Sequence, residues 1–145
     1  MRLSTRGYYG LKAMFDLAQN YGSHPVTLKS VAERQRLSES YLEQLIAKLR
    51  KAGLVKSFRG ARGGYILARE PVRITVGDVV RVLEGPIAPV YCVNEEEPGK
   101  CDEVDYCVTR TVWLKLRDGI DGILDSIKLS DLCLEAEKLS KQAGR

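Results

Sequence analysis

Residues 37–67 read LSESYLEQLIAKLRKAGLVKSFRGARGGYIL, and these residues are the most informative about the architecture of the chain. Its first part places apolar side chains at i, i+3, i+4 and i+7, which predicts an amphipathic helix closed by a glycine. These positions are Leu42, Leu45, Ile46, Leu49 and Gly53. Two short strand-like runs, 54–58 and 65–67, then flank a glycine-rich segment and predict a β-hairpin. A helix followed directly by such a hairpin is typical of a winged helix-turn-helix.

The opposite face of this helix carries hydrogen-bonding side chains. Ser38 is a good N-cap, and the Gln and hydroxyl groups that follow suit base edges in the major groove. Glu43 can accept a hydrogen bond from a cytosine amine, or it can close a capping box with Ser40. The hairpin between the strands adds Arg59 and Arg62, which suit phosphates and a narrow minor groove. The residues expected to contact DNA are Arg2, Ser38, Ser40, Tyr41, Glu43, Gln44, Lys48, Arg59 and Arg62.

Three further helices are expected around this unit. Ser4 can cap a first helix that ends near Gly22, and Thr27 can open a short second helix. A tight connection at residues 35–37 joins the second helix to the one quoted above. Thr75 and Asp78 start another helix, which Gly85 ends. The expected fold class is therefore mainly α with a small β-hairpin wing.

Composition and charge narrow the class of protein. The chain has 145 residues, 44% apolar and 29% charged, as expected for a soluble globular protein in the cytoplasm without a membrane segment. Residues 1–86 hold 15 Lys/Arg against 7 Asp/Glu, whereas residues 87–145 hold 8 against 12. A basic first half favours a phosphate partner such as double-stranded DNA. The sequence contains no nucleophile–base pair or phosphate-cradling glycine loop, so we expect no enzyme.

Three cysteines, Cys92, Cys101 and Cys107, fall in one acidic stretch. Their separation is longer than the two to four residues usual between paired zinc ligands, and such a loop can hold thiolates around an iron–sulfur cluster. Zinc and a redox switch that joins Cys101 to Cys107 remain alternatives. A [2Fe–2S] cluster takes four protein ligands, and the fourth is open. The candidates for it are Asp102, Glu103, Asp105, Cys133 and His24, although Cys133 fits a core position and His24 a surface turn.

Residues 108–127 are expected to form one long helix. Val112, Leu116, Ile120, Ile123 and Ile127 form a near-heptad row along it. This row suits a twofold dimer seam, because operator binding of this kind needs two reading heads. A last short helix is expected at 131–139, followed by a frayed tail that reaches residue 145.

Several stretches resemble the IscR-type winged helix-turn-helix regulators, which include nitric-oxide-sensing and cysteine-metabolism branches. The similar stretches are MRLSTRGYYGLKAM, LSESYLEQLIAKLRKAGLVKSFRGARGGYIL, ITVGDVVRVLEGPI and CVTRTVW. The resemblance implies a homodimer on a pseudo-palindromic operator, with Ser40, Tyr41, Glu43 and Gln44 reading bases and Arg59 entering the minor groove. It also implies that Cys92, Cys101 and Cys107 match three ligands of a [2Fe–2S] cluster.

The chain departs from the family pattern at four places. The first two cysteines are further apart than usual, and Arg110 stands where one branch has a histidine ligand. Arginine stays protonated and cannot ligate a metal. Tyr8 stands where another branch has an acidic ligand, and RVLEGPIAPV is similar to the cysteine-metabolism branch, whose members lack the cluster cysteines.

The function expected from these features is transcriptional repression controlled by a cluster. Residues 1–86 form the DNA-binding domain, 87–107 a cluster-binding loop, and 108–145 a dimerisation helix with a C-terminal helix. Such a regulator senses cluster supply or redox state and controls iron–sulfur biogenesis genes. The alternatives are a cysteine-metabolism, thiol-responsive or nitric-oxide-responsive regulator of the same fold and, in another class, an iron–sulfur electron carrier.

Overall fold

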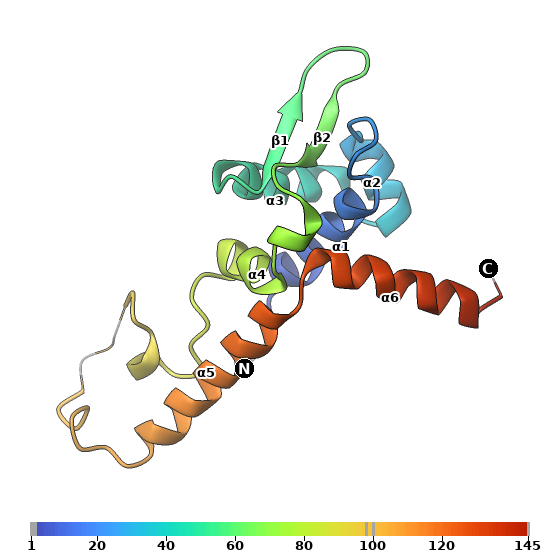
Figure 1. Ribbon diagram of the computed structural model, residues 1–145. Coiled ribbons are helices and arrows are strands. Elements are labelled where there is room, and N and C mark those ends of the chain that lie inside the picture. Colours follow the sequence, from blue (N-terminus) through green and yellow to red (C-terminus); the bar gives the residue numbers. More distant parts are fainter. Residues whose placement is uncertain (1–2, 98, 100, 145) are drawn as a thin grey trace.

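The chain folds into a helical head that carries the hairpin, followed by an extended arm (Figure 1). The computed structural model describes residues 3–97, 99 and 101–144. The head, residues 3–86, contains α1 (Thr5–Gln19), α2 (Leu28–Gln35), α3 (Glu39–Lys51), β1 (Val55–Phe58), β2 (Gly64–Leu67), η1 (Pro71–Arg73) and α4 (Val76–Glu84). The arm, residues 87–126, contains η2 (Tyr91–Val93) and α5 (Arg110–Ser126), and α6 (Leu129–Gln142) follows it.

The helices of the head begin at the residues that the sequence predicts. The hydroxyls of Ser4 and Thr27 accept hydrogen bonds from the first turns of α1 and α2. Thr75 and Asp78 form a reciprocal capping box at α4. Helix α1 ends with Asn20 as its C-cap, close to Gly22, near which the sequence predicts its end, and the Asn20 side-chain amide donates to the Asp16 carbonyl oxygen at 2.8 Å.

The two strands pair in antiparallel register from Val55 opposite Leu67 to Phe58 opposite Gly64. A short bridge ties this wing to the segment before α2, because Val26 and Tyr65 exchange backbone hydrogen bonds of 3.0 and 2.7 Å. A Cβ at Gly64 would lie 2.4 Å from the Val26 carbonyl oxygen. Only glycine permits this close approach, so Gly64 fixes the base of the wing against the head.

A single apolar core holds the head together and draws side chains from α1, α2, α3 and α4 and from the hairpin. It also includes Leu129 at the start of α6, which is fully buried. The largest buried side chains are Met14, Leu17, Leu42, Leu45, Ile46, Leu49, Leu67, Ile74 and Leu129. The end of the chain therefore contributes to the core of the head.

Helix α2 is also fixed to α1 by a buried charge. The Asp16 carboxylate is 1% exposed and accepts two hydrogen bonds from the Arg34 guanidinium, at 2.7 and 2.9 Å. Gln35 donates to the same carboxylate at 3.1 Å. These partners satisfy the buried oxygens and set the angle between the two helices that precede α3.

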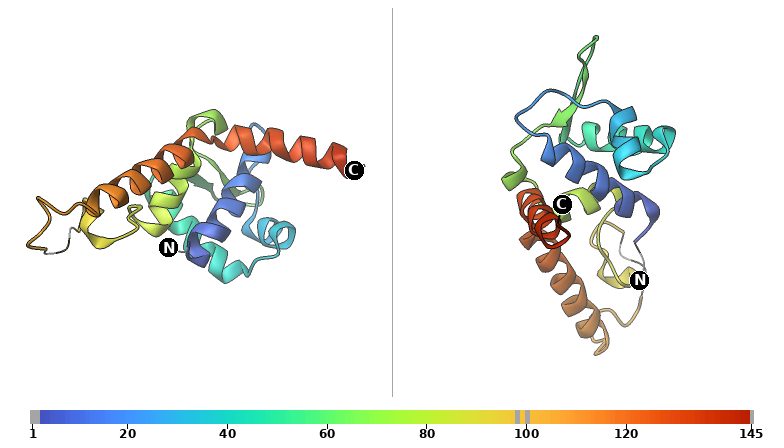
Figure 2. Two further views of the ribbon diagram at one scale, coloured as in Figure 1. Left: turned by 90° about the horizontal axis from the view of Figure 1, so that it is seen from below. Right: turned by 90° about the vertical axis from the view of Figure 1, so that its right-hand side faces the viewer.

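Helix α5 projects from the head on the side opposite the wing; it begins at the far end of the arm and runs back to the head, and α6 then lies across the head (Figures 1 and 2). Ile74 and Leu129, and Val76 and Ile127, are joined by backbone hydrogen bonds of 2.9 and 2.8 Å. The expected last helix, 131–139, is too short, because Asp131 accepts from the Lys128 N–H and α6 runs on to Gln142. The expected frayed tail is therefore helical up to that residue, and Arg145 lies outside the described residues.

Candidate DNA-binding surface and cysteine site

Helix α3 turns one face to the core and the other to solvent. Its four apolar residues at helical spacing are at most 1% exposed. The hydroxyl of Ser38 accepts from the Tyr41 N–H at 3.3 Å and lies 3.0 Å from the Ser40 hydroxyl. The alternative role of Glu43, closing a capping box with Ser40, is wrong. The N-cap of α3 is Ser38, and its hydroxyl accepts from the Tyr41 N–H. The exposed residues of this face include Ser40, Glu43, Gln44 and Lys48.

Tyr41 differs from its neighbours on α3, because it is half-buried. Its hydroxyl lies 2.8 Å from the Thr5 hydroxyl, and its ring packs edge-on to Tyr9 with centroids 6.2 Å apart. Tyr41 therefore joins the start of α3 to the start of α1, in addition to any contact with DNA.

The wing presents two exposed arginines, Arg59 and Arg62, on a tight glycine turn. Gly60 has φ +105, and its carbonyl accepts from the Gly63 N–H at 2.9 Å. A Cβ at Gly63 would lie 2.3 Å from the Phe58 carbonyl oxygen. The loop can therefore bring its backbone and both guanidinium groups close to a phosphate chain. Arg2, also expected at DNA, lies outside the described residues.

The three cysteines of the arm line one hollow at the end of the molecule opposite the wing. Cys92 lies in η2, Cys101 in the loop that follows, and Cys107 before α5, and all three are half-buried. The hollow has a volume of about 270 Å³. Its remaining lining residues are Val90, Tyr91, Glu103, Val104, Thr109, Arg110 and Trp113.

Two arginines of α5 fasten the cysteine loop, residues 87–107, to that helix. Arg110 donates through Nε and Nη2 to the Cys92 carbonyl, each at 3.4 Å. Two turns further along α5, Arg117 donates to the Val93 carbonyl at 3.0 Å and lies 3.3 Å from the Glu95 carboxylate. This role of the two arginines was not predicted from the sequence, although their spacing by seven residues on a helix beside the loop indicates a shared face.

The thiols of the chain have different acidities. The hydrogen bond with the Thr109 hydroxyl, at 3.3 Å, and the N–H groups of Arg110 and Thr109 lower the pKa of Cys107. Burial raises the pKa of Cys133, which lies on α6 against the core of the head. The charge of Cys101 is the main cause of a raised pKa at Tyr91, with burial, Cys92 and Cys107 also contributing. Tyr91 and the three thiols line the same hollow.

The donors of the hollow fit an iron–sulfur cluster by chemistry. Soft thiolates suit iron–sulfur clusters and zinc. Within the described part of the chain, no three His, Cys, Asp or Glu side chains converge closely enough to hold one metal ion.

The candidates for the fourth ligand lie in different places. Of the three acidic residues near Cys101, Glu103 lines the hollow. Cys133 packs on the head, and His24 is exposed in the turn before α2.

The exposed polar face of α3 and the arginine-tipped hairpin beside it define a winged-helix DNA-binding protein. The chain belongs to the Rrf2 family, described as "Iron-dependent Transcriptional regulator", whose pattern matches residues 3–135. The transcriptional regulator CymR of Bacillus subtilis is 52% identical over 91% of this chain and 89% of its own. The regulator IscR of Cronobacter sakazakii is 41% identical over 96% of this chain and 84% of its own. The solved structure of T. potens IscR is 56% identical, with a TM-score of 0.79 over 96% of this chain and 90% of that one.

These similarities confirm the winged-helix fold, the resemblance to IscR-type regulators and a non-enzymatic role in transcription. The chain is a DNA-binding transcriptional regulator. Its relatives include both the cysteine regulator and the IscR branch, so the iron–sulfur cluster and the target genes stay predictions. No helix in the described residues is long and apolar enough to cross a membrane.

Proposed function

We propose that this protein is a homodimeric repressor whose grip on a pseudo-palindromic operator depends on a [2Fe–2S] cluster in the arm. The observation that carries the proposal is that Cys92, Cys101 and Cys107 line one hollow. The loop that carries the cysteines lies at the far end of the molecule from the wing (Figure 1), so a sensing end would be separate from a reading end. This arrangement supports regulation by a group that never touches DNA.

The reading end uses the exposed face of α3 and the wing. Ser40, Glu43 and Gln44 would contact base edges, because α3 is seated on the core by its other face and can enter a major groove. Lys48 would neutralise phosphate, and Arg59 and Arg62 would enter the minor groove or grip its phosphates. Ser38, Tyr41 and Arg2 complete the proposed set of DNA contacts.

The sensing end would hold the cluster through the three thiols, and Glu103 would be the fourth ligand. Glu103 is favoured because it lines the hollow beside the cysteines. The bound cluster would supply a centre that is sensitive to iron supply, oxygen and nitric oxide, and a carboxylate ligand would make it more labile than four thiolates. Arg110 and Arg117 hold the backbone of Cys92 and Val93 on α5, which keeps the first thiol at the wall of the hollow.

The dimer would form through the apolar residues that α5 leaves exposed. Val112, Leu116 and Ile123 are 53%, 41% and 63% exposed. Near the C-terminal end of α5, a groove of about 500 Å³ runs between α1, α4 and α6 and is lined mainly by apolar side chains. Leu124 on α5 lines this groove and adjoins the exposed Ile123 in the sequence, which brings the groove next to the exposed residues of α5. A second copy of this chain covers both and supplies the second reading head that a palindromic operator requires.

The decisive experiment is purification without air, followed by counting iron and sulfide and recording the visible spectrum. We expect about two irons and two sulfides per chain. A variant with Cys92, Cys101 and Cys107 all changed to alanine should be colourless and should lose the cluster-dependent change in operator affinity. Cys133→Ala is the matched control and should keep both. A colourless wild-type protein that takes up no iron and sulfide on reconstitution would refute the cluster.

A second candidate function is direct sensing of cysteine or thiol status. It is favoured by the lowered pKa of Cys107 and by the 52% sequence identity to CymR of B. subtilis. The solved structure of that protein is described as the global cysteine regulator. In that case the wild-type protein is colourless, and a mild thiol oxidant changes its operator affinity. Cys107→Ser should then abolish the change.

A further inference from the structure

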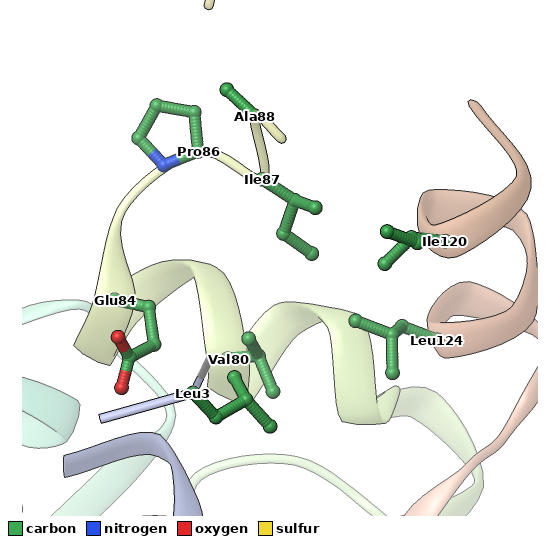
Figure 3. Close-up of a pocket in the computed structure, with 8 residues that line it drawn as sticks. All are labelled: Leu3, Val80, Glu84, Pro86, Ile87, Ala88, Ile120 and Leu124. Carbon is green, nitrogen blue, oxygen red and sulfur yellow. The ribbon is translucent and has the colours of Figure 1, made fainter. Parts of the chain in front are cut away.

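The carboxylate of Glu84 lies where the end of α4 meets the start of α1, beside a hollow between α4 and α5 (Figure 3). It accepts hydrogen bonds from the Ser4 hydroxyl and from the Gly7 N–H, the latter at 2.8 Å. The first turn of a helix has N–H groups without partners in the helix itself. Glu84 therefore acts as a second cap for α1, supplied by a helix nearly eighty residues away.

The protonation state of Glu84 suits this role. Burial by itself raises its pKa, but the hydrogen bonds from Ser4 and Gly7 and the charge of Arg6 together bring the pKa below the ordinary value. Glu84 is therefore an ionised acceptor, and the positive end of the α1 dipole favours it.

Helices α1 and α4 are too closely packed at this point to move independently. A Cβ at Gly10 would lie 2.0 Å from the Leu83 Cδ1 atom, and one at Gly7 would lie 2.8 Å from Glu84 Oε1. Arg6 also donates from Nε to the Leu83 carbonyl at 3.3 Å. The first turn of α1 must therefore follow the last turn of α4.

The same turn of α1 touches the reading end. The Thr5 hydroxyl, beside Ser4, lies 2.8 Å from the hydroxyl of Tyr41 in the first turn of α3. Tyr41 adjoins Ser40 in the sequence, and Ser40 lies on the exposed face. A displacement of the α1 start therefore reaches the end of α3 that carries the proposed base contacts.

On its other side, α4 leads directly to the cysteine loop. Gly85, with φ +84, ends the helix, and Pro86, Ile87 and Ala88 then form one wall of a hollow of about 430 Å³ opposite α5 (Figure 3). Arg81 joins α4 to α5 through Asp121, at 3.0 Å, and Asp125. The C-terminal part of α4 is thus joined both to the cysteine loop, which follows it in the chain, and to α5, to which Arg110 fastens that loop.

We infer that Glu84 is a positioning residue that transmits the state of the cysteine loop to the start of α3. The order of contacts is the cysteine loop, the end of α4, Glu84, the first turn of α1, and then Thr5 with Tyr41. This inference goes beyond the proposed function, because it holds whatever the hollow of the three cysteines binds.

The first test follows backbone hydrogen exchange in the cluster-free full chain. Glu84→Gln should raise exchange about tenfold at the Gly7 amide and at residues 38–42, because a charge-assisted hydrogen bond is lost. Glu137→Gln on α6, an exposed carboxylate, is the matched control and should change neither. A merely structural role would raise exchange throughout the core, including at Leu17 and Leu49. Wild-type exchange at residues 38–42, once Gly7 has lost protection, would overturn the inference.

The second test asks for transmission. Arg110→Ala removes one of the two attachments of the loop to α5, the one at Cys92, and should raise exchange at residues 38–42 in the otherwise wild-type chain. In the Glu84→Gln background the same change should have no further effect there, because the link is already broken. Additive effects would overturn the inference. If Glu84→Gln does not fold, Thr5→Val, which removes the hydroxyl and keeps the shape, replaces it with the same two outcomes.

Discussion

The head and the arm of this protein both contain amphipathic helices, but only the head buries them. Helix α3 has 13 residues and buries four apolar side chains, whereas α5 has 17 residues and buries none. The sequences of the two helices have the same periodicity, because in each of them apolar residues recur every three to four positions. Periodicity therefore identifies a helix face that must be covered, whereas the rest of the molecule determines what covers it.

Removing a core side chain of the head gives the largest expected effect. Leu49→Ala should lower the free energy of unfolding by about 2–5 kcal/mol, because Leu49 is fully buried and leaves a cavity. The matched change on the arm, Leu116→Ala, should cost under about 1 kcal/mol of the same quantity, because Leu116 is 41% exposed. Urea unfolding at low protein concentration measures both. Equal losses would contradict the contrast between head and arm.

Charging the exposed row of α5 should break association and leave folding intact. Ile123→Asp should weaken self-association about a hundredfold, because twofold symmetry places the unpaired carboxylate in the interface twice. Sedimentation equilibrium measures the dissociation constant, and circular dichroism checks the helix content. Ser140→Asp, which adds the same charge on α6 outside the apolar row, is the control and should associate as wild type does. An unchanged constant for Ile123→Asp would remove this row from the interface.

The sequence predicts the head well because the decisive signals are local. The caps at Ser4, Thr27 and Thr75, the face of α3 and the hairpin each depend on residues within a few positions of one another. The wing also needs Gly64 against Val26, which no local pattern specifies.

The arm is predicted less completely because its contacts join distant positions. Three cysteines in one loop indicate a site, but the parts of Thr109, Arg110 and Arg117 depend on how the loop folds onto α5. Leu129 is a further example. The sequence places it in the dimerisation segment 108–145, but its side chain is buried in the core of the head, far away in the sequence. Glu84 was missed because its partners lie 77 and 80 positions away.

The cysteines offer a smaller effect that also distinguishes head from arm. In the cluster-free chain, Cys107 should react with iodoacetamide about tenfold faster than Cys133 near pH 8, since the thiolate is the nucleophile. The pKa of Cys107 is lowered and that of Cys133 is raised, so the rate at Cys107 should level off at a lower pH. Mass spectrometry of tryptic peptides measures each rate. In urea the two rates should converge. A rate difference that persists in urea would mean that local sequence, and not the fold, causes the different reactivities of the two thiols.

The smallest expected effect concerns one unfavourable backbone position that the head retains. Arg36, at the turn between α2 and α3, has φ +57 and ψ +49, a left-handed conformation that costs a side chain roughly 1–2 kcal/mol. Arg36→Gly removes this cost but gives the unfolded chain more freedom, so the net gain in stability should be at most about 1 kcal/mol. Thermal unfolding measures it.

The matched change runs in the opposite direction at Gly53, which follows α3 with φ +83 and has open space around the position of a Cβ. Gly53→Ala should therefore lose about 1 kcal/mol through the backbone alone, because no neighbour has to move. If Arg36→Gly destabilises the head while Gly53→Ala behaves as expected, the arginine side chain itself stabilises the turn. The strain at residue 36 would then be offset by contacts of its guanidinium, and the turn would depend on side-chain chemistry as well as on backbone geometry.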